Sequence, residues 1–108
     1  MDLYNDIMRR SRKLDQTLRA LPKMAKDYAT AESNYRTMLA EKVLKLEAEG
    51  RPVTNLQIIA RGDKQVAAAK AREIMTEALY KATLERINVQ KLQIKLLSEQ
   101  MRREWGNV

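Results

Sequence analysis

The sequence of 108 residues contains no cysteine, no histidine and no phenylalanine. Without cysteine it has no disulfide framework of the kind that stabilises small secreted domains. Without cysteine or histidine, cysteine nucleophiles, serine–histidine–aspartate triads and the usual zinc sites are excluded. A glycine-rich phosphate loop is also missing. We therefore predict a protein that is not an enzyme and binds no metal and no cofactor.

Long apolar runs are absent too. No stretch approaches the roughly 20 apolar residues of a membrane span. The first residues carry Asp2, Asp6 and Asp15, which argue against a signal or transit peptide. We therefore expect a cytoplasmic protein without a membrane span.

Glycine and proline are scarce, with three and two residues respectively. Alanine, leucine, lysine, glutamate, arginine, glutamine and methionine dominate instead, and these are the strong helix formers. This composition predicts a single all-α domain over residues 1–108.

Apolar residues of the first half recur every seven residues, and the pattern continues across Pro22. They are Ile7, Leu14, Leu21, Tyr28 and Tyr35. Proline costs a helix interior about 3 kcal/mol unless it occupies the first turn. Either a new helix starts at Pro22, or one long helix kinks there. We predict helices over residues 2–20 and 22–49.

A connector follows, in which Gly50 and Pro52 end the second helix. Thr54 and Gln57 have the spacing of a capping box, with Val53 and Ile58 placed for a hydrophobic staple, and predict a short helix over residues 55–61. Asp63 is a good N-cap for a last helix over residues 64–105.

The last helix carries Tyr80, Ile87, Ile94 and Met101 seven residues apart, which is a coiled-coil pattern. A helix of about 42 residues is roughly 63 Å long, whereas a compact globule of about 100 residues has a radius of gyration near 13 Å. We therefore predict an elongated helical hairpin of two long helices joined by a short one. Coiled-coil-like packing between subunits would then form a homo-oligomer.

The net charge is +7, which favours a polyanion as partner, either nucleic acid or an anionic membrane surface. Two features carry this excess. The first is the cluster Arg9, Arg10, Arg12 and Lys13. The second is a stripe on the last helix made of Lys81, Asn88, Lys91, Lys95, Ser98 and Arg102. Such a face follows a phosphate backbone without reading bases, although a solvated helix face explains it equally well.

Two further segments admit two interpretations each. Trp105 can stack on an unpaired base or anchor the helix end against another subunit. Arg61-Gly62-Asp63 is the tripeptide that integrins bind, but it also lies where one helix ends and the next begins. In a chain without disulfides or a secretion signal, the helix-junction interpretation is preferred.

The layout resembles the small phage recombination mediators of the UvsY type. "EKVLKLEAEGRP" closes one helix, "GDKQVAAAK" opens a long one, and "LLSEQMRREWG" ends it, so the resemblance covers residues 25–105. It implies a ring-forming protein that binds single-stranded DNA and loads a recombinase onto DNA coated by single-strand-binding protein. It also implies a DNA-contacting segment at Lys45, with Glu47 where the family has arginine and Lys42 as a substitute.

The sequence thus predicts an oligomeric accessory protein that binds single-stranded nucleic acid, a recombination mediator in the cytoplasm of a bacterial host if it is phage-encoded. The alternative is a helical structural or adaptor protein whose basic faces meet acidic protein. The predicted contacts to nucleic acid are Arg9, Arg10, Arg12, Lys13, Lys42, Lys45, Lys81, Lys91, Lys95, Arg102 and Trp105.

Overall fold

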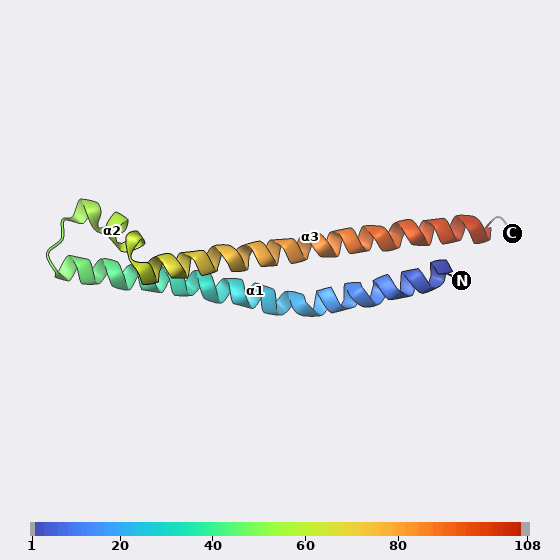
Figure 1. Cartoon of the computed structure of the whole chain (residues 1–108), viewed down its shortest axis with the longest axis horizontal. Helices are drawn as coiled ribbons and strands as arrows, with labels where there is room; N and C mark the ends of the chain where they lie inside the picture. The colour runs from blue at the N-terminus through green and yellow to red at the C-terminus, as the bar shows by residue number, and fades with distance from the viewer. Residues whose placement is uncertain (1, 107–108) are drawn as a thin grey trace. The chain divides into compact units, whose positions relative to one another are not determined.

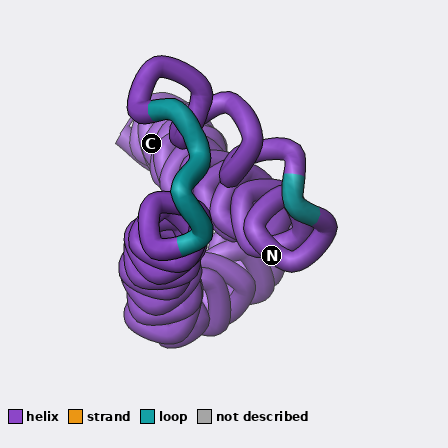
Figure 2. The backbone as a smooth tube through the Cα atoms, turned by 90° about the vertical axis from the view of Figure 1, so that its left-hand side faces the viewer, coloured by secondary structure: helices purple, strands orange, loops and turns teal. Residues whose placement is uncertain are grey.

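The computed structural model describes residues 2–106, and helices make up nearly all of this stretch (Figure 2). The elements are α1 (Asp2–Ala48), the 3-10 helix η1 (Val53–Asn55), α2 (Leu56–Gly62) and α3 (Lys64–Gly106) (Figure 1). No strand occurs within residues 2–106. The predicted all-α class is confirmed.

One correction concerns Pro22, which lies inside α1 and does not divide it into two helices. Proline removes one backbone hydrogen bond and crowds the carbonyl of Leu18. Both residues are exposed, so water can satisfy the freed carbonyl. The apolar register across Pro22 therefore belongs to one continuous helix of 47 residues.

The end of α1 follows the prediction. Gly50 has φ 80°, the left-handed conformation that glycine adopts without cost. The Arg51 amide donates to the Leu46 carbonyl at 3.1 Å, and the Gly50 amide donates to the Glu47 carbonyl at 3.0 Å. These two bonds form a Schellman cap, which satisfies carbonyls that the helix end would otherwise leave open.

The predicted capping box is wrong. Residue Asn55, not Thr54, occupies the N-cap of α2, and neither η1 nor α2 has a side-chain cap. Val53 and Ile58 are 80% and 73% exposed, so they form no hydrophobic staple. The backbone makes a 3-10 turn before α2 instead, in which the Asn55 amide donates to the Pro52 carbonyl at 3.2 Å.

The described chain divides into two compact units. The central unit comprises residues 25–79, which are the second half of α1, the connector, α2 and the start of α3. Its core joins Leu46 of α1 to Leu56 and Ala60 of α2, with Leu39, Val43 and Ile59 packed around them. A helix of seven residues is not stable alone, so this core holds α2 in place.

The terminal unit comprises residues 2–24 of α1 and 80–106 of α3. Within it, the start of α1 lies beside the end of α3, so the two segments are antiparallel (Figure 1). Among its described residues, only Thr83 and Ile87 are buried. The terminal unit therefore has a thin core.

The residues of α3 that face α1 follow a repeat of three and four. In the terminal unit they are Tyr80, Thr83, Ile87, Gln90, Ile94, Leu97 and Met101. The predicted heptad residues Tyr80, Ile87, Ile94 and Met101 are half-buried or buried there. The predicted helical hairpin is thus confirmed, and its contact surface, here called the seam, includes polar side chains.

Candidate nucleic-acid interface

The two units differ strongly in charge. The terminal unit carries twelve lysine and arginine residues against six aspartate and glutamate residues, a net charge of +6. The central unit carries nine against eight, a net charge of +1. A polyanion is therefore attracted mainly to the terminal unit.

Lys91, Lys95 and Arg102 are exposed on α3 of this unit. At about 100° per residue their side chains leave the helix within a sector of roughly 40°. None of the three makes an ion pair with any residue between 2 and 106. We call these three residues the basic stripe. Asn88, Ser98 and Lys81 continue the same face by helical spacing.

The predicted cluster near the N-terminus is only partly available. Arg9 pairs with Asp6, and Arg10 Nε lies 3.4 Å from Asp6 Oδ1. Arg10 also donates a hydrogen bond of 3.0 Å to Gln93 of α3. Arg12 and Lys13 are exposed and have no ion pair within the described chain.

The structure does not join these two basic features into one surface. Gln93, which binds Arg10, lies on α3 about 180° from Arg102. The N-terminal cluster thus borders one side of the seam, and the basic stripe borders the other. This separation was not visible in the sequence, because it depends on which flank of α3 faces Arg10.

Exposed aromatic side chains accompany the basic stripe. Trp105 is 64% exposed and Tyr4 is 49% exposed, both in the terminal unit. Helical spacing places Tyr4 on the flank of α1 away from Arg10, and Trp105 in the same direction as the seam residue Ile87, one turn beyond Met101. Tyr4 therefore lies on the side of the seam that carries the stripe, and Trp105 lies exposed at the end of the seam. Sequence reasoning missed Tyr4, since one tyrosine beside Asp2 and Asp6 carries no signal of its own.

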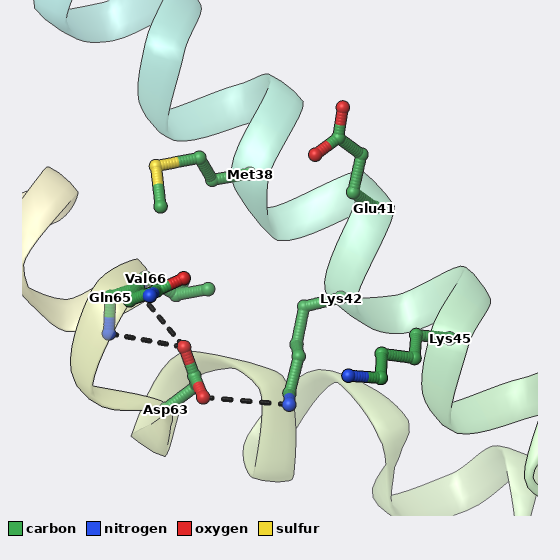
Figure 3. Close-up of a pocket in the computed structure, with 7 residues that line it drawn as sticks. All are labelled: Met38, Glu41, Lys42, Lys45, Asp63, Gln65 and Val66. Carbon is green, nitrogen blue, oxygen red and sulfur yellow. Dashed lines mark hydrogen bonds and ion pairs between the residues drawn. The ribbon is translucent and has the colours of Figure 1, made fainter.

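Lys42 and Lys45 belong to a different site, in the central unit (Figure 3). They line a hollow of about 190 Å³ beside the start of α3, together with Met38, Glu41, Asp63, Gln65 and Val66. Lys42 Nζ lies 3.4 Å from Asp63 Oδ1. A phosphate at Lys42 would have to compete with this ion pair. Lys45 is exposed and stays a predicted contact.

Asp63 is the N-cap of α3, as predicted. Its Oδ2 accepts hydrogen bonds from the amides of Gln65 at 3.1 Å and Val66 at 3.3 Å. The bond from Val66 and the charge of Lys42 hold the pKa of the Asp63 carboxyl below its ordinary value. The Arg61-Gly62-Asp63 tripeptide is thus a helix junction whose carboxylate is already engaged.

Asp63→Ala should lower the thermal midpoint by a few degrees, because two amides at the helix start and Lys42 lose their partner. The folded pKa is lowered, so the stabilisation is present above the ordinary aspartate range near about pH 4. It is lost as pH falls through the lowered folded value. The difference in thermal midpoint between the wild type and the variant should therefore narrow as the pH falls below the ordinary aspartate pKa of about 3.9. Thermal melts at neutral pH and in acid would test this.

Asp63→Asn is the matched control, since asparagine also caps helices but carries no charge for Lys42. It should lose less stability than the alanine variant. Equal loss would show that the ion pair, not the cap, stabilises the junction. No loss in either variant would contradict both roles.

The described residues supply no metal site. Within residues 2–106, no group of three or more aspartate, glutamate, histidine or cysteine residues is placed to hold an ion. Glu73 pairs with Lys70 at 3.4 Å. A hydrogen bond to Glu77 raises the pKa of the Tyr28 hydroxyl. Glu73 and Glu77, which lie four residues apart on α3, are therefore both already engaged.

A helix that crosses a bilayer must be about 20 residues long and predominantly apolar. None of the helices within residues 2–106 combines the length and the apolar character that a transmembrane segment requires.

Comparison with protein-family models, curated proteins and solved structures found no significant match.

Proposed function

We propose that this protein is a non-enzymatic, oligomeric accessory protein that binds single-stranded nucleic acid through its terminal unit. One observation carries the proposal. The net charge of +6 is concentrated in the terminal unit, where Lys91, Lys95 and Arg102 are exposed on one face without ion-pair partners in the described chain. Cations in this arrangement bind successive phosphates and ignore base sequence.

The aromatic side chains favour a single strand over a duplex. Unpaired bases expose flat faces that stack on aromatic rings, whereas the bases of a duplex are already stacked on each other. Tyr4 is exposed on the side of the seam that carries the basic stripe, and Trp105 is exposed at the end of the seam. The other tyrosines are half-buried in the hairpin and cannot offer an open face.

The finer form of the proposal is a phage-type recombination mediator acting in the bacterial cytoplasm. It rests on the resemblance in layout between residues 25 and 105. In that role the protein would meet a recombinase and a single-strand-binding protein, and would help to load the former onto single-stranded DNA. Both proteins are proposed partners.

Affinity for a labelled single-stranded oligonucleotide should fall linearly on a logarithmic scale as salt rises. Each phosphate neutralised contributes a slope of about −0.7 for single strands, so three contacts along the stripe give a slope of about −2. Fluorescence anisotropy between about 50 and 200 mM salt covers the range in which this effect is large. A flat profile would contradict phosphate binding.

The second candidate is a helical structural or adaptor protein. The observation in its favour is the number of large apolar side chains left exposed on α3 of the terminal unit, among them Val89, Leu92 and Leu96. An electrophoretic shift separates the two candidates. Failure to shift single-stranded DNA, duplex DNA or RNA at moderate salt would favour the adaptor.

A further inference from the structure

The side of α3 that points away from α1 carries an apolar face of its own in the terminal unit. Val89, Leu92 and Leu96 are 44%, 54% and 54% exposed. They are spaced by three and four residues, so they leave the helix within a sector of about 60°. This sector lies roughly 170° from the seam residues Ile87, Ile94 and Met101. We call Val89, Leu92 and Leu96 the outer face.

Two charged residues bound the outer face at its ends. Glu85 precedes Val89 by four residues, and Arg103 follows Leu96 by seven. Both lie in the same sector of the helix as the outer face. Both are exposed, and neither makes an ion pair with any residue between 2 and 106. The face thus has one acidic end and one basic end.

We propose that the outer face binds the same face of a second copy of this chain, with the two α3 helices antiparallel around a two-fold axis. In the register that centres the axis at residue 94, Leu92 packs on the partner subunit's Leu96, and Leu96 packs on the partner subunit's Leu92. The same register places Glu85 opposite the partner subunit's Arg103. By symmetry each contact occurs twice.

The charges of Glu85 and Arg103 favour a second copy of this chain as the partner and favour an antiparallel arrangement of the two α3 helices. Parallel helices would place Glu85 against the partner subunit's Glu85, and Arg103 against the partner subunit's Arg103. Like charges at such positions are destabilising. The antiparallel register turns both contacts into attractions. A second copy is the occupant because this chain itself carries the complementary acidic and basic ends.

The register is not ideal, because Lys95 comes close to the partner subunit's Lys95 near the axis and Val89 lies opposite the partner subunit's Glu99. The apolar area is also small, since three large side chains on each copy cannot reach the roughly 1,200 Å² of a stable interface. Association through this face alone is therefore weak and depends on concentration. Salt weakens the repulsion between the lysines by screening it.

Sedimentation of the full chain over a wide concentration range tests the proposal. Leu92→Gln with Leu96→Gln should weaken dimerisation at least about tenfold, the change expected when the central apolar contact of an interface is lost. Leu44→Gln with Ile58→Gln is the matched control, since these two residues are also large, apolar and exposed, at 64% and 73%, but lie in the central unit. The control should dimerise like the wild type. Far-ultraviolet circular dichroism should show unchanged helicity in both.

A charge exchange tests the antiparallel register separately. Glu85→Arg and Arg103→Glu should each weaken dimerisation several-fold, because each creates two like-charge contacts in the dimer. The double variant Glu85→Arg with Arg103→Glu should restore it. A monomer at all concentrations, association that ignores the leucine variants, or a double variant without rescue would each overturn the proposal.

The test does not depend on nucleic acid. A chain that dimerises without binding an oligonucleotide would keep this inference and refute the proposed function. A chain that binds an oligonucleotide as a monomer would overturn this inference and the oligomeric part of the proposed function, but would keep nucleic-acid binding by the terminal unit.

Discussion

Replacing Lys91, Lys95 and Arg102 with glutamate should reduce affinity for a single-stranded oligonucleotide by about 100-fold or more, equivalent to about 2.8 kcal/mol. Three attractive contacts to phosphate become three repulsive ones, and like-charge contacts cost several kcal/mol at an interface. The salt dependence should change as well. Its logarithmic slope should shrink by about 2, since three phosphates are no longer neutralised.

The control variant must change the net charge by the same amount as the stripe variant while leaving Lys91, Lys95 and Arg102 in place. Lys26, Arg51 and Lys64 are exposed in the central unit and have no ion pair within residues 2–106. Their replacement by glutamate also lowers the net charge by six units, because each substitution changes the charge by two. If this control loses as much affinity as the stripe variant, binding follows overall charge and the stripe is not a site.

The helical class, the end of α1 and the junction between α2 and α3 could be predicted from sequence because local chemistry decides them. Gly50 adopts a left-handed conformation that other residues avoid, and Asp63 caps a helix with its own carboxylate. Each of these effects acts within a few residues. The sequence around the position therefore contains all the information that is needed.

Pro22 and Thr54 show where local rules fail. The cost of Pro22 is offset because the register of apolar residues continues on both sides, and its position on α1 is exposed. The capping signal at Thr54 loses to the packing of Leu56 and Ala60 against Leu46. In both cases a tertiary contact or a continuous helix outweighs a preference of about 1 to 3 kcal/mol.

The candidate site was predictable as a set of residues but not as a surface. Helical spacing alone places Lys91, Lys95 and Arg102 on one face. It cannot show that Arg10 reaches Gln93 on the other flank of α3, which separates the N-terminal cluster from the stripe. It also cannot show which of the two apolar faces of α3 is covered by α1. That choice leaves Val89, Leu92 and Leu96 exposed.

Leu46→Ala should destabilise the central unit by about 2–5 kcal/mol, the range for removing a buried leucine side chain. Leu46 is 4% exposed and is the buried residue of α1 in the core that it shares with Leu56 and Ala60 of α2. Ala60 is fully buried against it, and a small alanine side chain cannot move to fill the cavity. The connector and α2 should therefore lose their attachment to α1 before the long helices melt.

Hydrogen exchange of the α2 amides measures this loss directly, because a helix of seven residues has no stability of its own. Protection of Leu56–Gly62 should collapse in Leu46→Ala while the middle of α3 in the terminal unit stays protected. Leu44→Ala is the control, since Leu44 lies one half-turn away on α1 and is 64% exposed. It should change stability by less than about 0.5 kcal/mol. Equal protection of α2 in both variants would mean that the core around Leu46 does not hold the connector, and that Asp63 and Lys42 alone fix the junction.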